Sequence, residues 1–129
     1  MISIAREQAR IEAMLAAAPS TLGPLVTVLR AGLKDWQDAL ALIRSDPAEA
    51  RRHARRLMAL MADILAASLL LGEAEEGLKL GDHRKHLIAR LFIEARFQPP
   101  ARRGILPQRD WMHREFEALA TCQPVAAAP

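Results

Sequence analysis

The stretch GDHRKH brings two histidines together with three other charged side chains. His83 and His86 are three residues apart, so on a helix both imidazoles share one face and could bind the same metal ion. A metal site needs at least a third ligand, and Asp82 is the nearest candidate. An aspartate directly before a helix is better used to cap the first backbone N–H groups. We therefore predict two solvated histidines here and no metal site.

Asp63 is the only charged residue in the apolar run LMALMADILAASLLL, from Leu57 to Leu71. A buried carboxylate is strongly unfavourable unless it is paired. We expect an ion pair or hydrogen bond from Asp63 to an arginine on a neighbouring helix, and the alternative is a polar contact to a ligand or partner chain. The run is too short for a typical membrane span and carries this charge. It therefore predicts a buried helix and no membrane span.

Basic residues cluster at the predicted beginnings of two helices. Positive charge there opposes the helix dipole, which costs roughly several tenths of a kcal/mol per residue. These side chains are therefore candidates for contact with an acidic partner or a phosphate-bearing anion. Pairing with acidic residues of adjacent helices, or simple solvation, would also explain them. The residues are Arg51, Arg52, Arg55 and Arg56 in one helix, and Arg84 and Lys85 in the next.

Nothing in the sequence resembles a catalytic arrangement. There is no glycine-rich phosphate loop, no Cys/His pair and no carboxylate pair in an obvious cleft. The single Cys122 cannot form an internal disulfide, and the first ten residues carry charge where a signal peptide has an apolar core. These features favour a reducing, cytoplasmic location. We do not expect this chain alone to be an enzyme, although it could form part of one.

The composition favours helices that pack into one soluble domain. Of the 129 residues, 51% are hydrophobic, 26% charged and only 4% aromatic, with no tyrosine. Alanine and leucine dominate, and both suit helices better than strands. The net charge of +3 arises from 18 basic and 15 acidic residues, a weak excess that argues against nucleic acid as a partner. We predict a single domain over residues 1–120 and a flexible tail over 121–129.

Proline, glycine and aspartate separate the expected helices. Pro47 follows a capping Asp46 and begins a helix that reaches Lys79, and the next helix begins at His83 and ends before Pro99. No alternating strand pattern is present. The expected architecture is all-α, an antiparallel bundle-like packing of four to five helices around one long central helix that the others surround. The remaining helices are expected over 3–18, from about 21 to 45, and within 108–120.

The segment from Thr21 to Arg103 resembles a known family. An alanine-rich helix is followed by a polar break and then by a helix of the type K..lAr.f.e..lP, an order similar to the C-terminal helical extension domain of acyl-CoA dehydrogenases. The family's flavin-binding β-domain and its core with a glutamate base have no counterpart in these residues. The matching positions are Lys85, Leu87, Ala89, Arg90, Phe92, Glu94 and Pro99.

This resemblance implies a non-catalytic helical module that packs on a flavoenzyme, builds its oligomer or helps to cover its acyl-CoA site. The chain itself would bind no cofactor, and FAD would belong to a partner or a missing domain. The alternative is a small self-associating helical bundle that serves as an adaptor or regulator, and an anion-binding module is a third possibility. Either way we expect a protein partner or a homo-oligomer.

Overall fold

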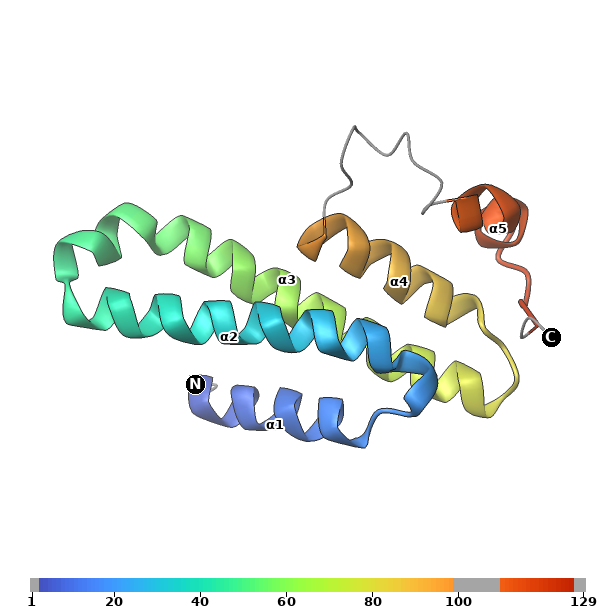
Figure 1. Ribbon diagram of the computed structural model, residues 1–129, viewed down its shortest axis with the longest axis horizontal. Coiled ribbons are helices and arrows are strands. Elements are labelled where there is room, and N and C mark those ends of the chain that lie inside the picture. Colours follow the sequence, from blue (N-terminus) through green and yellow to red (C-terminus); the bar gives the residue numbers. More distant parts are fainter. Residues whose placement is uncertain (1–2, 99–109, 127–129) are drawn as a thin grey trace.

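The computed structural model describes residues 3–98 and 110–126, and these residues form helices and connecting segments without a strand (Figure 1). The predicted all-α class is confirmed. A short 3-10 turn, Ser20–Leu22, joins the first helix to the second. The α-helices are α1 (Ile4–Ala17), α2 (Gly23–Ser45), α3 (Pro47–Lys79), α4 (Arg84–Phe97) and α5 (Asp110–Ala120).

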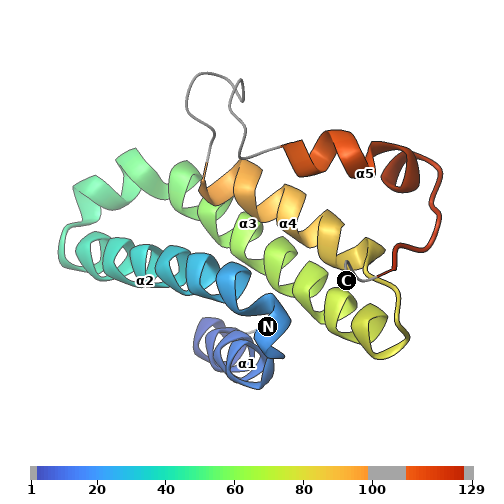
Figure 2. The ribbon, with the colours of Figure 1, turned by 45° about the vertical axis from the view of Figure 1, so that its right-hand side comes forward.

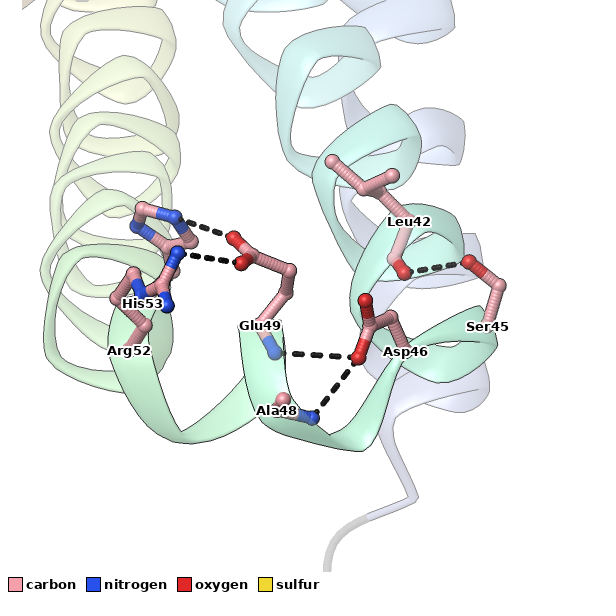
Figure 3. Close-up of polar contacts among 7 residues, drawn as sticks. All are labelled: Leu42, Ser45, Asp46, Ala48, Glu49, Arg52 and His53. Atoms are coloured by element: carbon pink, nitrogen blue, oxygen red, sulfur yellow. Dashed lines mark hydrogen bonds and ion pairs between the residues drawn. The ribbon is translucent and has the colours of Figure 1, made fainter.

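A single residue, Asp46, separates α2 from α3 and forces the two helices into an antiparallel hairpin. Its Oδ1 accepts hydrogen bonds from the backbone N–H groups of Ala48 at 3.0 Å and Glu49 at 3.4 Å (Figure 3). Pro47 fills the first helical position, where no intrahelical donor is needed. The cap predicted from the sequence is therefore confirmed, and it begins the longest helix of the chain.

The α2–α3 hairpin is the framework on which the other helices pack. Helix α4 returns along the C-terminal half of α3 and also contacts α2, while α1 lies against the opposite side of the hairpin (Figure 1). Helix α5 packs on the outside of α4, away from α2 (Figure 2). The arrangement is the bundle-like packing around one long helix that the sequence predicts.

The core combines large side chains with fully buried alanines of α3 and α4. Leu29 of α2 and Ile93 of α4 are fully buried. Ala67 and Ala74 of α3 and Ala89 of α4 are also fully buried. The most extensive contacts between elements are those of α3 with α4 and of α2 with α3.

One expectation about α3 is wrong, because the other helices do not surround it. Met58 and Leu69 remain 63% and 54% exposed. By length and composition, α3 could cross a membrane, and only 28% of its most apolar 18-residue stretch is buried. Helix α1 and the segment Ser20–Ser45 pass the same test only when they are taken together as one span, which is bent by 112°. The core helix of a soluble protein passes the same test, so the absence of a membrane span stays a prediction.

Alanine substitution should change the free energy of unfolding in opposite directions at two glycines of α3. A Cβ at Gly77 would lie 2.9 Å from the backbone oxygen of Asp82, which cannot move without opening the α3–α4 turn. A Cβ at Gly72 would meet only the Met14 sulfur, at an ordinary 3.8 Å. We expect Gly77→Ala to lower the free energy of unfolding by about 1–2 kcal/mol and Gly72→Ala to raise it by up to about 1 kcal/mol.

Urea unfolding followed by circular dichroism measures both values. Equal stabilisation by the two substitutions would show that helix propensity alone decides, and would contradict the tight packing at the α3–α4 turn.

Candidate functional site

The arginines at the start of α3 lie at the exposed tip of the α2–α3 hairpin. Glu49 pairs with Arg52 at 2.7 Å and with Nε2 of His53 at 2.9 Å (Figure 3). Arg51, Arg55 and Arg56 are exposed and have no ion-pair or hydrogen-bond partner among the residues that the structure describes. Residues 44–56 hold five arginines and two acids, so the tip carries a charge equal to the net +3 of the chain.

A groove of about 200 Å³ runs between α2 and α3 beside this tip. Leu42 is 61% exposed at its edge, and His53 and Arg56 are its polar members. The groove could hold an apolar side chain of another molecule, but it contains no pair of groups for acid–base or nucleophilic chemistry. The remaining lining residues are Ala39, Ile43, Leu57 and Leu60.

The second basic pair, Arg84 and Lys85, makes contacts within the chain. Arg84 donates to the backbone oxygen of Leu119 at 3.4 Å and to the Cys122 sulfur at 3.3 Å. Lys85 forms an ion pair with Glu73 of α3 at 2.8 Å. The Lys85–Glu73 pair matches the alternative in which acidic residues of adjacent helices explain these charges, whereas among the described residues Arg84 donates to a backbone carbonyl and a sulfur and to no acidic residue.

The structure does not bring the two basic clusters together. Lys85 lies beside Gly77 near the C-terminal end of α3, whereas Arg56 lies near its N-terminal end. The helical rise of about 1.5 Å per residue separates these positions by about 30 Å. One anion site that uses both clusters is therefore excluded.

The turn between α3 and α4 is tied to the segment after α5. The backbone N–H of His83 donates to the carbonyl of Val125 at 2.7 Å. Oδ1 of Asp82 accepts from the backbone N–H groups of Arg84 at 2.9 Å and Val125 at 3.1 Å, and these two hydrogen bonds lower the pKa of Asp82. Helix α4 begins one residue later than predicted, with His83 at the N-cap position, and Asp82 before it accepts from the first helical N–H group. Asp82 also holds part of the segment for which the sequence predicts flexibility.

The two histidines lie close together but without further ligands. The ring centroids of His83 and His86 are 6.3 Å apart, and no group of three or more His, Cys, Asp or Glu within the described ranges could hold a metal. Burial, then the charges of His83 and Arg90, lower the pKa of His86. His86 is thus half-buried and not fully solvated, and the prediction of no metal site stays a prediction.

Asp63 has the expected kind of partner but not the expected burial. Its Oδ1 lies 3.8 Å from Nε of Arg96 on α4. The side chains of Asp63 and Arg96 are 31% and 58% exposed, so water screens the pair. An apolar run in the sequence does not reveal that Asp63 lies at the margin of the α3–α4 contact.

Helix α3 carries an exposed apolar strip, which we call the outer face of α3: Met58, Ala62, Leu65, Ala66 and Leu69. Steps of three and four residues place these side chains on one side of the helix. Met58, Ala62 and Leu69 are exposed, and Leu65 and Ala66 are half-buried. The sequence interpretation missed this face because it assigned all apolar positions of α3 to the core.

Comparison with protein-family models, with curated proteins and with solved structures finds no match. The resemblance to the acyl-CoA dehydrogenase extension therefore rests on the residues that suggested it. It stays a prediction, and the function has to be argued from the geometry of the described surface.

Protonation of His86 should destabilise the protein. Its pKa is lower in the folded chain than its ordinary value of 6.5, so this contribution to stability is complete above pH 6.5 and is lost as the pH falls through the lowered pKa. We expect the free energy of unfolding to fall between about pH 7 and pH 5, and His86→Leu to flatten this decline. His53→Leu is the matched control, and an equal flattening by both would contradict the assignment.

The pair between Asp63 and Arg96 should contribute little to stability. Because both side chains are partly exposed, we expect Asp63→Asn to change the free energy of unfolding by less than about 1 kcal/mol. Thermal unfolding of the variant beside Arg96→Gln measures this. A larger loss in either variant would show that the pair is shielded from water in solution.

Proposed function

We propose that this chain is a non-catalytic helical module that acts by packing against another protein surface. The observation that carries the proposal is the exposed outer face of α3, an apolar strip on the longest helix of the fold. Exposed apolar strips of this kind mark interaction sites in soluble proteins. Most ionisable side chains of the described residues are used in caps and ion pairs or are exposed to water, and the half-buried His86 has the cationic groups of His83 and Arg90 as neighbours.

The contacts of the charged residues also support a role in binding. Arg84, Lys85 and Asp82 are used within the chain, whereas Arg51 and Arg55 at one end of the outer face have no described partner. Free charges at the margin of an apolar strip steer association and fix orientation. The arrangement therefore has the composition of an interface, with an apolar middle and a charged rim.

The resemblance makes an FAD-dependent acyl-CoA dehydrogenase the first foreign partner to test. In that case the flavin and any acyl-CoA contact belong to the assembly, and this module packs on the enzyme or builds its oligomer. The second candidate is a self-associating bundle with an adaptor or regulatory role. The outer face of α3 favours this candidate, because its apolar residues recur at helical spacing and two such faces can pack against each other.

The proposal predicts that binding depends on the outer face. A tagged chain purified from cells should recover a protein in stoichiometric amount, and Leu69→Glu should reduce that recovery at least tenfold because it places a charge in the apolar strip. Leu91→Glu is the matched control, since Leu91 is also an exposed leucine but lies on α4. Flavin absorbance of the recovered complex identifies a flavoprotein partner, and a differently tagged copy of the chain identifies self-association.

Equal recovery with all three chains would contradict a role for the outer face. Normal circular dichroism and thermal unfolding of Leu69→Glu are required so that lost recovery reports lost binding.

A further inference from the structure

We infer that the outer face of α3 binds the same face of a second copy of this chain, with the two α3 helices antiparallel. The inference rests on the proposed function, and it names the partner and the geometry. A two-fold axis would cross α3 at its middle, between Asp63 and Ile64. Two-fold dimers use the same patch on both copies, so the patch must be complementary to itself.

The apolar positions of the outer face satisfy this requirement. Met58 and Leu69 lie equally far from the midpoint of the pattern, and so do Ala62 and Leu65. In the antiparallel pair Met58 of one copy therefore packs against Leu69 of the other. The small side chains of Ala62 and Ala66 near the centre would let the two helix backbones approach closely.

The charges at the two ends of the face favour the antiparallel orientation. Arg51 and Arg55 precede the apolar strip, and Glu73 and Glu76 follow it on the same side of the helix. Arg51 and Glu76 lie equally far from the midpoint. The distances of Arg55 and Glu73 from the midpoint differ by one residue. Antiparallel pairing brings each arginine to a glutamate of the partner, whereas parallel pairing would place like charges together.

The contacts of these four side chains within the chain still allow them to form ion pairs with a second copy. Arg51 and Arg55 are exposed and unpaired in the described part of the chain. Glu73 and Glu76 each engage one carboxylate oxygen, with Lys85 and Lys79 respectively, in ion pairs exposed to water. Such pairs contribute little and rearrange easily, so both glutamates can also receive an arginine from a partner.

The centre of the face holds no unpaired charge. Asp63 is close to the midpoint in sequence but is directed to α4, where Arg96 is its partner. The strip from Arg51 to Glu76 extends about 38 Å along the helix, which is long but narrow. It lies at the small end of the range for specific interfaces, so we expect a dimer that dissociates on dilution.

Two charge-reversal variants test the orientation. In R51E/R55E all four end positions are acidic, and in E73R/E76R all four are basic, so neither variant alone should form the dimer. Mixed in equal amounts, they should form a heterodimer, because each reversed pair then faces the opposite charge. Light scattering during size-exclusion chromatography measures the mass, which should be twice 14.3 kDa for the wild type and the mixture and 14.3 kDa for each variant alone.

Each contrary result overturns a defined part of the argument. A wild-type chain that stays monomeric at millimolar concentration refutes self-association, while recovery of a foreign protein that depends on Leu69 would keep the proposed function. A dimer that survives in both variants, or a mixture that stays monomeric, refutes the antiparallel orientation. Flotation of the wild type with phosphatidylglycerol vesicles, lost in Leu69→Glu, would assign the face to a membrane and overturn the inference.

The expected loss of dimerisation in the two charge-reversal variants should not arise from unfolding. Both variants should keep the wild-type melting temperature within a few degrees, since an acidic residue near the start of α3 and a basic one near its end suit the helix dipole. The control variant Leu91→Glu, which changes an exposed leucine outside the outer face, should remain dimeric.

Discussion

The close approach of α4 to α3 is the constraint on which the remaining arrangement depends. At the turn between the two helices, a Cβ at Gly77 would lie 2.9 Å from the backbone oxygen of Asp82 and 3.6 Å from Cβ of Lys85. A side chain at position 77 would therefore push the start of α4 outward. Because α4 lies so close, its C-terminal end reaches α2, and its other side offers Arg90, which stacks 4.4 Å from the ring centroid of Trp111 on α5.

The same packing explains why the longest helix is left partly uncovered. Helices α1, α2 and α4 together leave one face of α3 uncovered, so Ile64 and Leu71 are buried but Met58 and Leu69 are exposed. The chain forms a stable core without using all of its apolar residues. An exposed strip of this kind favours aggregation unless something covers it, and the charged residues at both of its ends limit which surfaces can do so.

Local signals in the sequence were sufficient for the fold. Asp46 and Pro47 mark the hairpin, and the helical periodicity predicts the all-α class, because caps and periodicity act over a few residues. The site depends on contacts between distant residues. The sequence could not show that Lys85 meets Glu73, that Asp63 is only half-buried, or which side of α3 stays exposed, since these depend on how the helices are rotated about their axes.

The contact between Asp82 and Val125 has a consequence for the order of folding. The two residues are 43 positions apart, whereas most contacts of α2, α3 and α4 join elements adjacent in sequence. Loop closure over such a distance is slow compared with the pairing of neighbouring helices. The α2–α3–α4 unit should therefore assemble first, and α5 should dock on a surface that is already complete. On a ribosome, the outer face of α3 would form while the residues that follow α5 are still being synthesised. Association with another chain could then begin before the contact between Asp82 and Val125 forms.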